Sequence, residues 1–450
     1  MGTTCLSGAD QEGERLFSLK VRSILNEKCV ACHGGEPEKK LKGKLDLSSR
    51  VAMLRGGESD KAAVVPGNPF ASPLYLAATR KHEDNWSAMP PKENDKLTDD
   101  QLRVFKRWIT LGAPWPDSDT QAAFIKEERA KPVTAEGVIV KTSGGESEDW
   151  TYRRYKLKNL WAFQPVVKPK IPNGESNPVD VFINRKLKKA GFKLAPQADF
   201  RTLVKRAYYD LIGLPPTPFE IFQFRKAWDK DPTKAWSELI DRLLASAHYG
   251  ERWGQHWLDV ARYADTGGYS NDYERSNMWR YRDYVIRAFN DDKPYDDFIR
   301  EQIAGDEIAD ASLRRRIQDW EKFQNARKNG KLYNALEAEQ LIASSFLRIG
   351  PWDPAMVKNP QARQIYLDDV VNAVGETFLS TTMRCFKCHD HKFDPLPTRD
   401  YYRMYAVFEP TQLAERTVPF IEAENLDGFN DGQAAMRRLL SFATDKHNAL

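Results

Sequence analysis

The sequence predicts a mainly α-helical protein made of two domains. In many segments of about three to four turns, apolar residues recur at helical spacing, and few segments alternate with the period of two that strands require. Glycine, proline or a polar turn follows each of these segments, as at the end of a helix. A chain of 450 residues is about three times the length of a typical domain, so it can form more than one core.

The first predicted domain covers residues 12–118. It opens with an amphipathic helix over 12–28. A later helix should begin just after Thr98, because Thr98 and Gln101 have the spacing of a capping box. Residues 119–176 then become rich in charge, glycine and proline, and we expect an extended linker there.

The second predicted domain, residues 177–412, consists of amphipathic helices. Within it, residues 311–335 are rich in charge and poor in apolar side chains, which indicates an exposed helical excursion. A last helix should start at Thr398, which we expect to act as its cap. Residues 413–450 are interpreted as a weakly specified tail.

Composition excludes several classes of protein. The formal charge is +4, from 68 basic and 64 acidic residues, so the strong basic bias of nucleic-acid-binding proteins is absent and no nucleic-acid partner is expected. The sequence has no apolar run long enough to span a membrane, and its start lacks the pattern of an export signal. A membrane tether could come only from Cys5, as the lipid-modified first residue of a mature lipoprotein. Five cysteines are too few for a disulfide scaffold.

Four of the five cysteines form two identical motifs, "CVACH" and "CFKCH". In each, two cysteines are separated by two residues and followed directly by histidine (CxxCH), which is the spacing of covalent c-type haem attachment. Two thiols one short turn apart can add to the haem vinyl groups, while the next imidazole reaches the iron. We therefore predict two covalently bound haem c groups, held by Cys29, Cys32 and His33 in the first motif and by Cys385, Cys388 and His389 in the second.

Three other chemistries fit parts of this pattern. The four cysteines could form one zinc site, and either pair could be a redox-active disulfide motif. A zinc site on Cys385, Cys388 and His391 is the third alternative. Covalent haem is favoured because both histidines recur at the same offset, and because no βαβ pattern of a thioredoxin-like protein surrounds either motif.

Each haem iron also has a distal axial position. In the first domain Met89 precedes two prolines that stiffen its loop, and a methionine opposite histidine raises the reduction potential and closes the iron to small ligands. His82 is its rival. In the second domain His256 is the first candidate, and the others are Met356, Met383 and His248. If none of them binds, the second iron is open and could carry catalysis.

His391 follows His389 too closely to bind the same iron from the other side, since two residues span only about 7 Å. It could instead donate to a haem propionate, ligate another metal or transfer protons. Asp259 and Arg262 are spaced to pair on one helix face. Asp265 and Asp272 are candidates for proton transfer or cation binding, although a buried ion-pair network that fixes the fold is the favoured interpretation of this cluster. Asp394 is a third candidate, and it could equally hold the haem propionates and its own loop.

Long stretches of the chain resemble the planctomycete cytochrome c domain proteins. In the first domain these include "ILNEKCVACHG", "MPPK" and "LTDDQLRVFKRWITLGAPWP". In the second, "FRTLVKRAYYDLIGLPPTP", "YGERWGQHWLDVARYADTGGY" and "CFKCHDHKFDPLPTRDYYRMYAVF" resemble the domain of unknown function that follows the cytochrome module in that family. The resemblance covers roughly residues 12–412. It implies covalent haem, a helical architecture and export to the periplasm or beyond, but it supplies no established reaction.

The sequence thus predicts an exported dihaem c-type cytochrome. Electrons would pass from the second haem to the first and then to a redox partner protein. One alternative is a haem-dependent oxidoreductase that acts on a carbohydrate-like or other organic substrate at the second haem, with the first haem as electron outlet. Another is a scaffold component of a larger redox complex.

Overall fold

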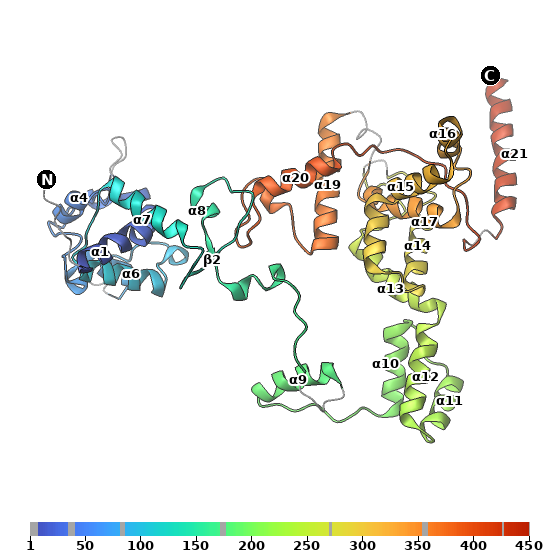
Figure 1. Cartoon of the computed structure of the whole chain (residues 1–450), viewed down its shortest axis with the longest axis horizontal. Coiled ribbons are helices and arrows are strands. Elements are labelled where there is room, and N and C mark those ends of the chain that lie inside the picture. The colour runs from blue at the N-terminus through green and yellow to red at the C-terminus, as the bar shows by residue number, and fades with distance from the viewer. Residues whose placement is uncertain are drawn as a thin grey trace. The chain divides into compact units, whose positions relative to one another are not determined.

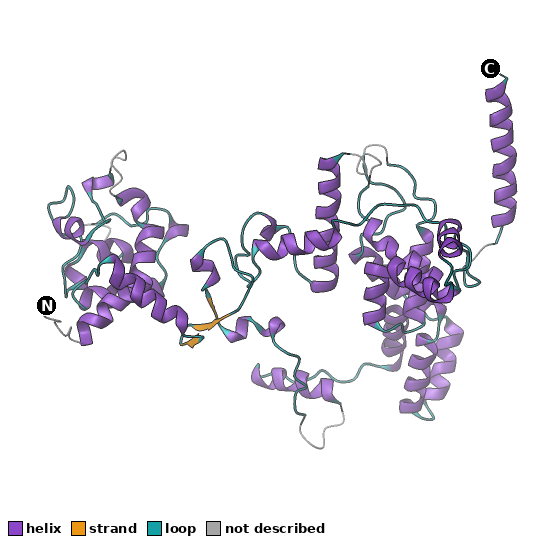
Figure 2. Ribbon diagram, turned by 45° about the horizontal axis from the view of Figure 1, so that its top comes forward, coloured by secondary structure: helices purple, strands orange, loops and turns teal. Residues whose placement is uncertain are grey.

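The computed structural model describes residues 8–34, 41–81, 86–171, 177–269, 272–352, 359–424 and 427–449, and helices dominate these parts (Figure 2). The predicted mainly α-helical class is therefore confirmed. The chain divides into two compact units, the first made of residues 1–140 and 152–163 and the second of residues 141–151 and 164–450. Three predicted groups lie outside the described residues: Cys5, His82 and Met356.

The first unit begins with the helix predicted over 12–28, which is divided by a π-helical turn. The helical segments of this unit up to residue 110 are α1 (Gly8–Leu16), η1 (Phe17–Val21), α2 (Arg22–Lys28), α3 (Val30–His33), η2 (Lys42–Lys44), α4 (Arg50–Arg55), η3 (Pro69–Ala71), α5 (Pro73–Thr79), η4 (Glu93–Asp95) and α6 (Asp99–Thr110). Their core is centred on Phe17, Phe105 and Trp108. Burial of such large aromatic side chains is the main source of stability in a unit of this size.

The predicted capping box is present at the start of α6. The Thr98 hydroxyl accepts the Gln101 N–H at 3.2 Å, and the Gln101 side chain accepts the Thr98 N–H at 2.9 Å. Two N–H groups that the helix leaves unpaired are thus satisfied. α6 then buries Trp108 in the core of the first unit.

The segment expected to be an extended linker contains a helix and a small sheet. Its elements are α7 (Ser118–Ala130), β1 (Val133–Thr134), β2 (Gly137–Ile139), α8 (Glu148–Thr151), β3 (Arg154–Tyr155), η5 (Leu157–Asn159) and η6 (Trp161–Phe163). The Asp117 carboxylate caps α7 by accepting the Thr120 N–H at 2.7 Å. The strands form an antiparallel sheet in the order β1-β2-β3, with Val138 opposite Tyr155. Residues 141–151, which lie between β2 and β3 in the chain, belong to the second unit.

After residues 141–151, the next helix of the second unit is α9 (Pro178–Lys189). It is followed by three helices that lie side by side in Figure 1: α10 (Phe200–Leu211), α11 (Pro218–Trp228) and α12 (Pro232–Leu244). This group has its own core around Tyr208, Phe224 and Leu239. The remaining elements are α13 (Ala247–Val260), α14 (Trp279–Asn290), α15 (Tyr295–Arg316), α16 (Trp320–Asn329), α17 (Ala335–Ala343), η7 (Ser344–Arg348), α19 (Pro360–Leu379), η8 (Cys385–Lys387), α20 (Thr398–Phe408) and α21 (Phe429–Asn448).

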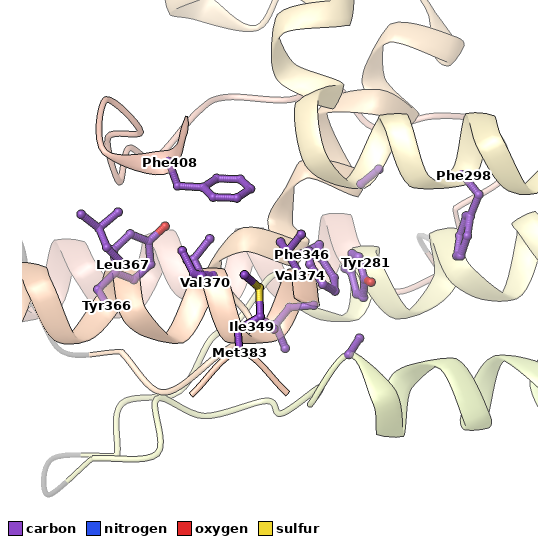
Figure 3. Packing of buried hydrophobic residues seen from close by; sticks show 14 of the residues in the cluster. Tyr281, Phe298, Phe346, Ile349, Tyr366, Leu367, Val370, Val374, Met383 and Phe408 are labelled. Carbon is purple, nitrogen blue, oxygen red and sulfur yellow. The ribbon is translucent and has the colours of Figure 1, made fainter. Parts of the chain in front are cut away.

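The largest core of the second unit joins α14, η7, α19 and α20 and is shown in part in Figure 3. It contains Tyr281, Phe346 and Val370. It also contains Phe386, which lies between the two cysteines of the second CxxCH motif. That motif is therefore attached directly to the main core.

Three sequence-based expectations for this unit differ from the structure. Residues 311–335 are helical as expected, but Leu313, Phe323 and Tyr333 build a small core there, so the segment is packed and not an exposed excursion. The predicted Asp259–Arg262 pair is wrong. α13 ends at Val260, and Arg262 has a positive φ of 62° and donates to both carboxylate oxygens of Asp369, on α19, at 2.7 and 2.8 Å.

The third difference is the cap of α20. The helix starts at Thr398 as predicted, but the Thr398 side chain makes no capping hydrogen bond. Asp390 accepts the Thr398 N–H instead, at 3.0 Å. Across the parts of the chain that the structure describes, no helix is both long and apolar enough to cross a membrane.

Candidate haem sites

The first CxxCH motif forms a tight turn at the end of α2. The Cys29 N–H donates to Leu25 O at 2.9 Å, and the N–H groups of Cys32 and His33 return to Cys29 O at 3.1 and 3.0 Å. Leu47, which is fully buried, donates its N–H to His33 O at 2.7 Å. The turn is therefore fixed on both sides, and Cys29 packs against the core of the first unit.

The chemistry of these side chains fits haem attachment. Burial, and to a smaller extent Cys32, raises the pKa of the Cys29 thiol to about 11. A redox-active disulfide motif needs the opposite, a lowered thiol pKa, so the surroundings of Cys29 do not favour the redox-disulfide alternative. The His33 Nδ1 atom is buried and has no hydrogen-bond partner among the described residues, so a hydrogen bond from this atom does not explain why a histidine stands here.

Met89 lies in a loop that is pinned by Arg80. The Met89 N–H donates to Ala77 O at 3.1 Å, while Arg80 donates to the carbonyl oxygens of Pro90 and Lys92 and pairs with Glu93. Met89 is 36% exposed, so its side chain is not buried in the core. A thioether on a fixed loop and free of the core suits an axial ligand.

The second CxxCH motif presents its reactive groups outward. Cys385, Cys388 and His389 are exposed, whereas Phe386 is only 1% exposed and meets the Tyr401 ring at 6.4 Å. Lys387 pairs with one oxygen of Asp368 on α19 at 3.1 Å, and Tyr401 donates to the other oxygen. The two residues between the cysteines thus anchor the turn, and the two thiols remain available.

His389 has the tautomer that an iron ligand needs. Its Nδ1 atom lies 2.9 Å from the backbone oxygen of Asp390. A carbonyl oxygen only accepts hydrogen bonds, so Nδ1 carries the hydrogen in this contact, and in the neutral ring Nε2 has a free lone pair. The second motif therefore offers two accessible thiols and one oriented imidazole, which fits a second haem.

His391 and Asp394 come together, but they stabilise their own loop. The His391 Nδ1 atom accepts the Asp394 N–H at 3.0 Å, and the ring lies edge-on to Phe386 at 5.9 Å. Across the described residues, no three histidine, cysteine, aspartate or glutamate side chains converge as ligands of one metal ion. This geometry argues against the zinc alternative on Cys385, Cys388 and His391.

The candidate distal ligands of the second motif lie in different surroundings. His256 is exposed on α13, where its ring meets Trp253 at 5.6 Å, and His248 is exposed and 2.7 Å from Glu251. Met383 is 4% exposed within the main core (Figure 3), packed so closely on Gly375 that a Cβ there would lie 2.5 Å from its sulfur. Of these three, only the two histidines have side chains that are free of the core.

The remaining predicted carboxylates, Asp265 and Asp272, accept hydrogen bonds within the loop that follows α13. Asp265 accepts the Tyr263 hydroxyl at 2.6 Å, and Asp272 accepts the Gly268 N–H at 2.8 Å. A hydrogen bond from Thr266, together with that from Gly268, lowers the pKa of Asp272. None of these hydrogen bonds reaches the CxxCH segment, so the structure does not bring Asp265 or Asp272 together with His391 and Asp394.

Residues 141–151 contact the segment that directly follows the second motif, and sequence reasoning missed them. The Glu146 N–H donates to Asp390 Oδ2 at 2.6 Å, and the Trp150 indole N–H donates to His391 O at 2.9 Å. Ser143 donates to Asp400, on α20, at 2.7 Å. The only signal in the sequence was a buried-type residue, tryptophan, and two glycines within an otherwise polar stretch.

A helical unit with a CxxCH turn fixed against its core, followed by a pinned methionine loop, defines the class of c-type cytochromes. In agreement, the family model of planctomycete cytochrome C matches residues 29–93. The chain belongs to the family described as a protein of unknown function (DUF1549), whose model matches residues 178–413, more than half of the chain. No curated protein and no solved structure matches it.

The match to a cytochrome c domain identifies at least one covalently bound haem c, on Cys29 and Cys32. The second CxxCH motif lies within residues 178–413, where the family description names no cofactor.

Proposed function

We propose that the protein is a dihaem c-type cytochrome. It would pass electrons from a haem on Cys385 and Cys388 to the haem on Cys29 and Cys32, and from there to a redox partner protein. The observation that carries the proposal is the second motif, where both thiols are exposed and the His389 Nδ1–H is fixed on a carbonyl oxygen. A bound haem supplies one-electron chemistry, and the residues of the chain hold it and set its potential.

His33 and His389 are the proposed proximal ligands. Met89 is the proposed distal ligand of the first haem, where a thioether raises the reduction potential. His256 is the proposed distal ligand of the second haem, because it is exposed and free of the core, whereas His248 lies 2.7 Å from Glu251. A higher potential at the first haem makes electron flow from the second haem to the first favourable.

We further propose that the protein works outside the cytoplasm, in the periplasm, because c-type cytochromes are typically exported proteins. The oxidoreductase and scaffold alternatives have less support. Two of the three carboxylates predicted for proton transfer, Asp265 and Asp272, accept hydrogen bonds within their own loop. His391 likewise accepts a hydrogen bond from its own loop.

Counting the haems tests the proposal. The chain is produced with a periplasmic haem-attachment system, and the mass of the intact protein gives the number of covalent haems. Two haems are expected in the wild type and one each in Cys385→Ala/Cys388→Ala and Cys29→Ala/Cys32→Ala. A chain that carries zinc and no covalent haem would contradict the whole proposal.

Spectra then separate electron transfer from catalysis. A low-spin second haem that does not bind cyanide supports electron transfer. A high-spin second haem that binds cyanide or peroxide supports the oxidoreductase alternative. The measurement is best made on the Cys29→Ala/Cys32→Ala variant, in which the second haem is the only one expected.

A further inference from the structure

Asp390 directly follows the proposed iron ligand His389 and is held at three points. Its backbone oxygen accepts the His389 Nδ1–H at 2.9 Å. Its side-chain Oδ2 accepts the Glu146 N–H at 2.6 Å, and its Oδ1 accepts the Thr398 N–H at 3.0 Å. The carboxylate therefore joins two segments of the second unit to the peptide that orients the imidazole.

The surroundings leave this carboxylate little freedom. Thr398 is the first residue of α20, so a negative group there also gains from the helix dipole. On the other side, a Cβ on Gly145 would lie 2.5 Å from Asp390 Oδ2 and 2.4 Å from the Trp150 ring, so only glycine allows this approach. Trp150 is buried and binds the next carbonyl, that of His391, at 2.9 Å.

We infer that Asp390 is a positioning residue for the proposed second haem: its carboxylate fixes the peptide whose carbonyl oxygen accepts the His389 Nδ1–H. This inference rests on the proposed function. A histidine that donates its Nδ1–H to a fixed acceptor is a more basic ligand. A more basic ligand stabilises the oxidised iron and lowers its reduction potential.

The first motif differs in this respect. His33 Nδ1 has no partner in the described part of the chain, and the proposed distal ligand there is a thioether. Asp390 therefore acts through His389 on the proposed second haem. By lowering the potential of that haem it adds to the difference made by the proposed Met89 ligand, and so favours electron transfer from the second haem to the first.

The test measures the midpoint potentials of both haems in the holoprotein. Asp390→Asn keeps the size of the side chain but removes one of its two acceptor oxygens, and Gly145→Ala displaces the Glu146 N–H without changing any charge. Both variants should raise the potential of the second haem and leave that of the first unchanged. A tenfold change in the electron equilibrium between the haems corresponds to 59 mV.

Two charge controls separate positioning from simple loss of a negative charge. Asp394→Asn and Asp400→Asn each remove one carboxylate from the same region and leave the Asp390 contacts in place; in Asp400→Asn an amide oxygen remains to accept the Ser143 hydroxyl. If these controls raise the second potential as much as Asp390→Asn does, or if Asp390→Asn and Gly145→Ala leave it unchanged, the inference is overturned while the dihaem proposal stands. A wild-type chain with one haem overturns both.

A second readout needs no second haem. In the Cys385→Ala/Cys388→Ala background, hydrogen exchange should show slow exchange of the Glu146 and Thr398 amides. Adding Asp390→Asn should make both amides exchange faster, whereas adding Asp394→Asn should not. Equal exchange in all three proteins would show that the carboxylate does not hold these segments, and would overturn the inference even if the Asp390→Asn holoprotein failed to assemble.

Discussion

Replacement of Glu424 by alanine should destabilise the second unit by about 3 kcal/mol. The Glu424 carboxylate is fully buried and accepts hydrogen bonds from Arg280 Nε at 2.6 Å, Arg280 Nη2 at 3.0 Å and the Ile421 N–H at 2.9 Å. Removing one partner of a buried ion pair costs about 3–5 kcal/mol, because the other charge stays buried without compensation. The lower end applies here, since Arg280 keeps the carbonyl oxygens of Val418 and Pro419 as acceptors.

Urea denaturation of the holoprotein, followed by far-ultraviolet circular dichroism, measures this loss as a shift of the midpoint. Glu415→Ala is the matched control, since Glu415 is 90% exposed and its nearest cation, Arg348, is 3.8 Å away. The control should leave the urea midpoint unchanged. A double variant, Arg280→Met/Glu424→Leu, should recover much of the loss. If Glu424→Ala costs no more than Glu415→Ala, the assignment of a buried, structure-forming ion pair is refuted.

Three further predictions concern packing, pH and the first haem. Gly305→Ala should lower the free energy of unfolding by about 1–3 kcal/mol, because the new Cβ would lie 2.0 Å from Gln340 O. Gly432→Ala, which has open space around it, should raise the free energy of unfolding by up to about 1 kcal/mol. Equal shifts of the thermal midpoint in the two variants would contradict this packing. Burial raises the pKa of Asp310, but hydrogen bonds from Arg416 and Tyr333 outweigh it, so the pKa lies below the ordinary 3.8. The stability that Asp310 contributes is therefore complete above the ordinary pKa and is lost as the pH falls through the lower pKa of the folded state. When the free energy of unfolding is measured against pH, Asp310→Asn should remove this loss on the acid side. Asp431→Asn, at an exposed site, should leave it unchanged. Met89→Leu should lower the reduction potential of the first haem and let its iron bind cyanide. Met53→Leu, at a methionine that is only 1% exposed in the core, should leave cyanide binding unchanged. An unaltered haem spectrum in Met89→Leu would exclude Met89 as the ligand.

The parts of the molecule that the sequence predicts are those that depend on neighbouring residues. The capping box of α6 needs only Thr98 and Gln101, and a CxxCH turn needs only five consecutive residues. Both were therefore readable from spacing alone. The tautomer of His389 is equally local in its contacts, but it requires the direction of one carbonyl, which no sequence pattern specifies.

The features that could not be predicted depend on distant partners. α20 has a threonine at its start, yet it is capped by Asp390, because a charged acceptor brought close by the chain fold replaces the weaker local one. Residues 311–335 have few apolar side chains, but Leu313, Phe323 and Tyr333 are large enough to form a core once the helices meet. Sequence polarity reports the average surroundings of a segment and misses such small clusters.

The segment 141–151 makes the second unit discontinuous along the chain. Its residue Glu146 binds Asp390, which lies 244 residues further along the chain. Residues 152–163, which follow the segment directly, belong to the first unit. During synthesis on the ribosome, the segment leaves the exit tunnel long before Asp390 does, so their hydrogen bond can form only after most of the chain has been made. A fragment that begins at residue 164 would lack the Glu146 and Trp150 donors. A fragment of the second unit prepared for crystallography or spectroscopy should therefore retain residues 141–151.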